Sequence, residues 1–231
     1  AIREAVRIYR GLAEENPAVF NPYLAMSLNN LAVQLAGVGD RGGAVEAIRE
    51  AVRIYRGLAE GNPAAFNPDL AMSLNNLSLR VAGVGDRGGA LEAIREAVRI
   101  YRGLAEENPA AFNPYLAMSL NNLANCLSEV GDRGGAVEAI REAVEIRRGL
   151  AEKNAAAFET DLVRALNILA RILTGTGESG EALRCFTDET ENFPTGLQAR
   201  LWLARARWQG QAGGVNDLHH AAELADTRRQ P

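Results

Sequence analysis

The chain has few cysteines and histidines, and it has no excess of positive charge. Its 231 residues include two cysteines and two histidines, and no Cys-x-x-Cys pair occurs. Two cysteines cannot build a disulfide framework, and this usage favours the reducing cytoplasm. The 25 Lys and Arg residues are outnumbered by 29 Asp and Glu residues, which gives a net charge of −4. Because no global positive field exists to attract a phosphate backbone, nucleic acid is not an expected partner.

The sequence also lacks an uninterrupted apolar run of the length that crosses a bilayer, and it has no signal-peptide pattern. We therefore expect no membrane partner. Hydrophobic residues make up 47% of the chain and charged residues 23%, which is typical of a folded globular protein. The chain starts with Ala1 inside a helical pattern, so we expect a fragment of a larger protein.

No group of residues with catalytic spacing is found. The repeated segment GVGDRGG has the glycines of a phosphate-binding loop, but it lacks the Lys and the Ser or Thr of that loop, and no strand precedes it. His219 and His220 are adjacent and face different sides of a helix, while Cys126 and Cys185 have no base at motif spacing. The sequence predicts no enzyme, no metal and no cofactor.

The most prominent feature of the chain is an internal repeat. The string AIREAVRIYRGLAE begins at Ala1, Ala47 and Ala93, and a variant begins at Ala139, so the period is 46 residues. Residues 21–66 and 67–112 differ at seven positions. A fixed period of this length is typical of stacked repeats. We predict a single array made of an orphan second helix of a truncated repeat (1–20), three repeats (21–66, 67–112 and 113–158), a divergent repeat (159–193) and a degenerate C-terminal capping helix pair (194–231).

Each repeat reads as two helices, which we call helix A and helix B. The Asn-Pro pair at 21–22 predicts the start of the first helix A, which ends near Gly37. The glycine-rich segment then turns the chain, and Asp40 is the expected cap of helix B, which ends at Asn62. Because the connections are short, successive helices should be antiparallel.

The apolar positions resemble the tetratricopeptide repeat signature, and the same order recurs in the next two repeats; in the first repeat it is carried by Leu28, Leu31, Ala32, Leu35, Gly39, Ala44, Ile48 and Ala51. The phrase SLNNLA and the long helix B are similar to the extended repeats of kinesin light chains and of related bacterial proteins. This resemblance implies an all-α, right-handed superhelical solenoid of antiparallel helix pairs. It also implies that the A helices line a concave groove that binds a peptide or protein segment.

The resemblance places three series of residues in this groove. The first is a ladder of amides, Asn29, Asn75, Asn121 and Asn167. The second is a methionine series, Met26, Met72 and Met118. The third, which we call the graded series, changes from apolar to polar along the chain and consists of Val33, Leu79, Asn125 and Arg171. Amides can pair with the backbone of any extended peptide. In the alternative interpretation, the ladder amides bond to neighbouring helices within the array. For Asn30, Asn76 and Asn122 we favour that structural role.

The predicted function is a protein-interaction module that binds a peptide or a neighbouring protein segment. The alternative is a structural or spacer array that self-associates, or that positions an effector or nucleotide-binding domain outside this segment. Self-association is expected at the uncapped N-terminal end, where Ile2, Ala5 and Tyr9 lack a preceding helix A.

Overall fold

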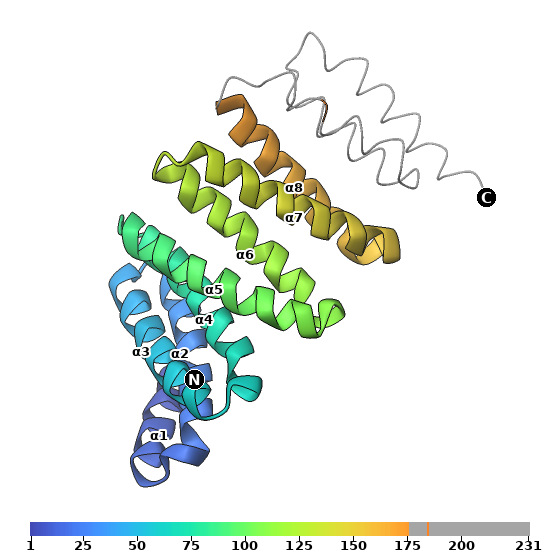
Figure 1. The fold of residues 1–231 in the computed structure, drawn as a ribbon. Helices are drawn as coiled ribbons and strands as arrows, with labels where there is room; N and C mark the ends of the chain where they lie inside the picture. The colour runs from blue at the N-terminus through green and yellow to red at the C-terminus, as the bar shows by residue number, and fades with distance from the viewer. Residues whose placement is uncertain (176–183, 185–231) are drawn as a thin grey trace, which may run out of the picture. The chain divides into compact units, whose positions relative to one another are not determined.

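The computed structural model describes residues 1–175 and residue 184, and this part of the chain contains eight helices and no strand (Figure 1). They are α1 (Ile2–Glu15), α2 (Pro17–Gly37), α3 (Arg41–Gly61), α4 (Pro63–Ala82), α5 (Arg87–Glu107), α6 (Pro109–Glu129), α7 (Arg133–Lys153) and α8 (Ala155–Gly175). The predicted capping pair, the last part of the divergent repeat, Cys185, His219 and His220 lie outside the described residues. None of the described helices is long and apolar enough to cross a membrane.

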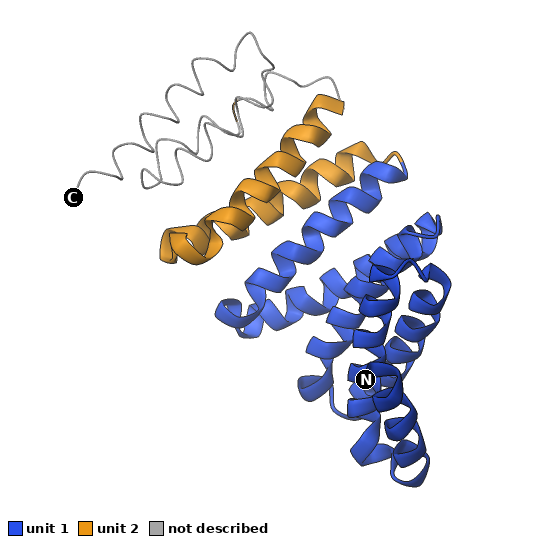
Figure 2. Cartoon of the chain, turned by 180° about the vertical axis from the view of Figure 1, so that it is seen from behind, with its two compact units in different colours: residues 1–130 blue, residues 131–231 orange. Residues whose placement is uncertain are grey.

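The chain divides into two compact units, residues 1–130 and residues 131–231 (Figure 2). Unit 1 contains α1 to α6, and each of these helices packs against the next one in the chain. In the described part of unit 2, α7 packs against α8. The structure therefore confirms an all-α array of helix pairs, in which α2, α4, α6 and α8 are A helices and the others are B helices.

Helices α2, α4 and α6 each begin five residues before the proline of the Asn-Pro pair that the sequence pattern predicted as their start. Helix α2 starts at Pro17, directly after Asn16, and Pro22 lies inside it. Proline at the first helical position costs no hydrogen bond, because the amide there has no partner within the helix. Pro22 inside the helix removes one backbone hydrogen bond, the one to the carbonyl of Ala18. The helix continues past this loss. In the next repeat a single residue, Asn62, ends α3 and caps α4, because its side chain accepts from the amide of Ala65 at 3.2 Å.

The predicted aspartate caps are confirmed. The Asp40 side chain accepts from the backbone amide of Gly43 at 3.0 Å, and Asp86 and Asp132 make the same bond in the following repeats. Gly39 precedes the cap with φ +86°, a conformation that residues with a Cβ rarely adopt. Within unit 1 this glycine-aspartate turn reverses the chain between α2 and α3 and between α4 and α5.

The core of unit 1 is built from repeated positions of both helix types. Leu28, Leu74 and Ile48 are almost completely buried. The A helices also contact one another directly, α2 with α4 and α4 with α6. The B helices are linked instead by long side chains, such as Arg10 and Glu50 at 2.7 Å. Within unit 1 the A helices thus form one continuous wall.

Candidate functional site: the exposed face of the A helices

The A helices of unit 1 leave one side uncovered among the described residues. Side chains at steps of three and four residues share one face of a helix, and four positions on each A helix form such a stripe. We call this set the A-helix face: Tyr23, Met26, Asn30 and Val33 on α2; Asp69, Met72, Asn76 and Leu79 on α4; Tyr115, Met118, Asn122 and Asn125 on α6. It lies opposite the buried leucines of the same helices.

The methionine and graded series lie on this face. Met26 and Val33 are each 49% exposed, and Met72 and Leu79 are also exposed. Met118 and Asn125 are half-buried. The stripe is therefore apolar on α2 and becomes more polar on α6, as the sequence comparison between repeats suggested. Contiguous exposed apolar side chains of this kind commonly mark an interaction surface.

The ladder amides are placed differently from the methionines. Asn29, Asn75 and Asn121 are buried, and the first two join neighbouring A helices. The Asn29 amide donates to the hydroxyl of Ser73 at 2.6 Å, and the Asn75 carbonyl oxygen accepts from Ser119 at 3.3 Å. These contacts match the structural interpretation of the ladder. A role in ligand binding stays a prediction for these residues.

The second asparagine of the second and third repeats completes the same network. The Asn76 amide donates to the Asn29 side chain at 3.1 Å, and the Asn122 amide donates to the Asn75 side chain at 2.9 Å. Both donors are half-buried, whereas Asn30 is exposed. Asn76 and Asn122 thus connect the A-helix face to the buried network.

Within unit 1 the asparagine network ends at Asn121. The side-chain carbonyl oxygen of Asn121 is buried and has no hydrogen-bond partner among the described residues. In the next repeat, the positions equivalent to the serine and the second asparagine are Ala165 and Ile168, which carry no polar side-chain group.

In unit 2 the two remaining predicted residues come together on α8. The Asn167 side chain donates to the carbonyl of Val163 at 2.8 Å, within its own helix. Arg171 is exposed, and it lines a hollow of about 450 Å³ together with Asn167, Thr160 and Arg164.

One series of site residues was missed by the sequence analysis. It is a pair of facing positions that recurs in successive repeats. On the A helices the position is occupied by Tyr23, Asp69, Tyr115 and Asp161. On the preceding B helices it is occupied by Tyr9, Tyr55, Tyr101 and Arg147. Tyr9 stacks on Tyr23 with ring centroids 5.6 Å apart, and Tyr101 stacks on Tyr115 at 5.7 Å. The signal was present, because Asp69 replaces a tyrosine at one of the seven positions that differ between the first two full repeats.

The two aspartates of this series have different surroundings. Asp161 accepts from two guanidinium groups, of Arg147 at 3.1 Å and of Arg164 at 2.8 Å. Asp69 is half-buried, and no hydrogen bond or ion pair reaches its carboxylate within the described part of the chain. Burial raises the pKa of the Asp69 carboxyl above its usual value. Burial also raises the pKa of the Tyr55 and Tyr101 phenols, and the nearby charge of Asp69 adds to both shifts.

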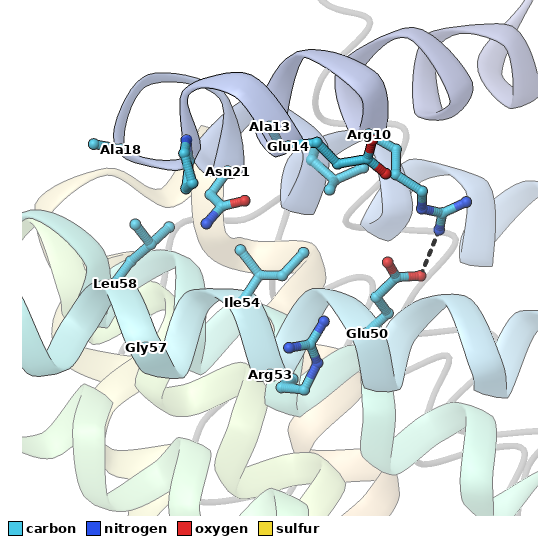
Figure 3. Close-up of a pocket in the computed structure, with 12 residues that line it drawn as sticks. Arg10, Ala13, Glu14, Ala18, Asn21, Glu50, Arg53, Ile54, Gly57 and Leu58 are labelled. Atoms are coloured by element: carbon cyan, nitrogen blue, oxygen red, sulfur yellow. Dashed lines mark hydrogen bonds and ion pairs between the residues drawn. The ribbon is translucent and has the colours of Figure 1, made fainter.

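The remaining features offer less for ligand chemistry. A pocket of about 580 Å³ lies among α1, α2 and α3, and the Arg10–Glu50 ion pair spans its rim (Figure 3). Burial raises the pKa of the Cys126 thiol, which keeps it in the unreactive protonated form. Among the described residues no three His, Cys, Asp or Glu side chains gather where they could hold a metal ion.

Comparison with known structures supports the fold assignment. A kinesin light chain-like protein of Podosopora anserina with nearly identical repeats gives a TM-score of 0.64 at 17% identity, over 89% of this chain and 97% of that chain. BtubC (BKLC) of P. vanneervenii gives a TM-score of 0.65 at 16% identity, over 98% and 86%. YrrB, a tetratricopeptide repeat protein with an unusual peptide-binding site, gives 0.51 at 16% identity, over 96% and 94%.

A search of curated protein sequences gives no significant match. The family model for the tetratricopeptide repeat matches residues 24–60, 70–109 and 116–154, which together make up half of the chain. These segments contain most of each A helix with the B helix that follows it, in three successive repeats. The chain therefore belongs to the tetratricopeptide repeat family.

Proposed function

We propose that the chain binds a peptide or protein segment on the A-helix face of unit 1. The observation that carries this proposal is the line of exposed apolar side chains, Met26 and Val33 on α2 and Met72 and Leu79 on α4. Methionine adapts its shape to different partners, which suits a surface that must accommodate an extended chain. The family to which the chain belongs supports a role in protein interaction.

The composition of the A helices also supports this site. Helices α2, α4 and α6 contain three charged residues, Asp69, Arg80 and Glu129, whereas α3 and α5 alternate Arg and Glu along their exposed sides. A surface with few charges loses little solvation when a ligand covers it. The exposed Asn30 adds a donor and an acceptor on this face that a peptide backbone can use.

We propose further that this binding takes place in the cytoplasm, on the basis of the low cysteine content and of the free, buried thiol of Cys126. The ligand-binding role carries no chemical step, since the stripe consists of apolar, amide, phenol and single carboxylate groups. On this proposal the chain acts as a binding module and not as an enzyme.

A displayed library of random peptides tests the proposed site. We expect the full chain to enrich a defined set of peptides, and Val33→Asp to bind them at least tenfold more weakly because it places a charge within the apolar stripe. Val84→Asp is the matched control, since Val84 is equally exposed but lies in the turn between α4 and α5. If no peptide is enriched and sedimentation shows concentration-dependent assembly, the self-associating array is the better description.

A further inference from the structure

Two repeats place an aspartate at the same position with different neighbouring side chains. Asp161 and Asp69 occupy the same place in their repeats, as do Arg147 and Tyr55, and Arg164 and Met72. Both guanidinium groups that bind Asp161 are thus replaced around Asp69 by side chains without charge. The A-helix face consequently contains a carboxylate whose cation is missing.

Two phenols, of Tyr55 and Tyr101, lie near this carboxylate. The Tyr101 hydroxyl donates to the carbonyl of Pro68, the residue before Asp69, at 3.5 Å. Tyr101 in turn stacks on the exposed ring of Tyr115. Aromatic faces and thioethers pack well against the flat guanidinium group of arginine, and a carboxylate can bind its N–H groups in pairs.

We infer that Asp69 is a specificity subsite that takes an arginine side chain of the bound peptide, with lysine as a weaker substitute. The inference rests on the proposed function and adds the chemistry of the ligand to it. The incoming guanidinium takes the place that Arg147 and Arg164 fill at Asp161. The residues beside this arginine should be apolar, because Met72 and Leu79 lie further along the same stripe of α4.

Charge complementarity selects this occupant over an acidic peptide. Asp69 is the one charged residue of the A-helix face in unit 1, and it lies beside two phenols that bring no positive charge. An acidic side chain at this place would be repelled. A neutral side chain would leave the half-buried carboxylate without a partner, which is costly.

The test uses the same random peptide library with the full chain and three variants. We expect the wild-type chain to enrich peptides with an Arg or Lys at a fixed place among apolar residues. Asp69→Asn should bind the enriched peptides about tenfold more weakly, the size of one charge-assisted hydrogen bond. Met72→Arg should do the same, because it supplies the cation from within the chain, as Arg164 does for Asp161. Glu129→Gln removes an equal charge from the exposed end of α6 and should keep wild-type affinity.

The outcomes separate this subsite from the proposed function. Enriched peptides without a basic residue, or basic peptides that Asp69→Asn binds as well as the wild-type chain, would overturn the subsite and leave peptide binding intact. If Asp69→Asn and Glu129→Gln weakened binding equally, the effect would come from the net charge of the chain and not from a contact at Asp69. That result would also overturn the subsite. Failure of the wild-type chain to enrich any peptide would remove both proposals.

Discussion

The facing pair of positions on consecutive B and A helices accepts three kinds of chemistry. It is a tyrosine stack at Tyr9–Tyr23, an aspartate beside a phenol at Tyr55–Asp69, and an ion pair at Arg147–Asp161. The Arg147 side chain is only 6% exposed, and burial lowers the pKa of its guanidinium although Asp161 partly opposes this effect. A buried cation of this kind depends on its carboxylate.

Removing that carboxylate should destabilise the chain. We expect Asp161→Ala to lower the free energy of unfolding by about 2 kcal/mol, because Arg147 would stay buried without its main partner. This value is smaller than that for a fully buried ion pair, because the Asp161 side chain is 39% exposed. The double variant Arg147→Tyr with Asp161→Tyr recreates the stack of the third repeat and should recover most of this loss. Urea unfolding measures both effects, and a double variant no more stable than the single one would contradict the exchangeable pair.

The raised pKa of Asp69 makes a prediction about pH. An acid whose pKa is higher in the folded state favours folding when it is protonated, so its ionisation costs stability as the pH rises above its unfolded value of about 3.9. Asp69→Asn should therefore unfold at higher urea concentration than the wild-type chain at pH 7, and the difference should shrink toward pH 3.5. Glu129→Gln, on an exposed site, should show no comparable gain. If the wild-type chain were more stable than Asp69→Asn at pH 7, the ionised carboxylate would favour folding, which would contradict this prediction.

At the scale of the helix, the period-46 pattern predicted most of the structure. The A and B helices and the aspartate caps follow from local rules that one helix obeys by itself. The predicted positions of Met26 and Val33 came instead from the resemblance to the repeat family, and both side chains are exposed. The start of helix A was predicted five residues too late because two Asn-Pro pairs compete. Asn16-Pro17 starts the helix, and the later proline is tolerated inside it.

The pattern of a single helix could not predict that Asn29 is buried and Asn30 exposed. The two residues are adjacent and lie about 100° apart on the helix, at the border between the buried and exposed sides. Which of them is buried depends on how closely the next A helix approaches, and that distance is set by the contact of α2 with α4. A single-helix pattern carries no information about that contact.

The asparagine network between A helices can be tested by two substitutions. We expect Asn75→Ala to cost about 1 to 3 kcal/mol in unfolding free energy, since the buried Ser119 hydroxyl and the Asn122 amide lose their acceptor. Asn121→Ala should cost less than Asn75→Ala, because the Asn121 carbonyl oxygen has no partner within the described residues. Unchanged urea stability of Asn75→Ala, together with weaker binding of an enriched peptide, would instead favour the ligand-binding role of the ladder.

At the scale of the whole chain, the near-identity of the repeats makes them removable units. The sequence PAAFNP occurs at both 63–68 and 109–114, so a deletion of residues 67–112 joins Phe66 to Asn113 and leaves a helix A start with unchanged local sequence. Stability in a stacked array is roughly a sum over repeats and their interfaces. The shortened chain should fold cooperatively, with similar helicity per residue by circular dichroism, and unfold at lower urea concentration.

This deletion also removes Asp69, and a second deletion of equal length supplies the control. Removing residues 21–66 joins Phe20 to Asn67 and retains Asp69, Met72 and Tyr115, with Tyr9 at the place that Tyr55 held. Both shortened chains lose part of the apolar stripe, so both should bind peptides more weakly than the full chain. Only the chain that retains Asp69 should still prefer peptides with an arginine. Because the two variants match in length and repeat number, a preference that survives in both, or in neither, would show that it does not come from Asp69.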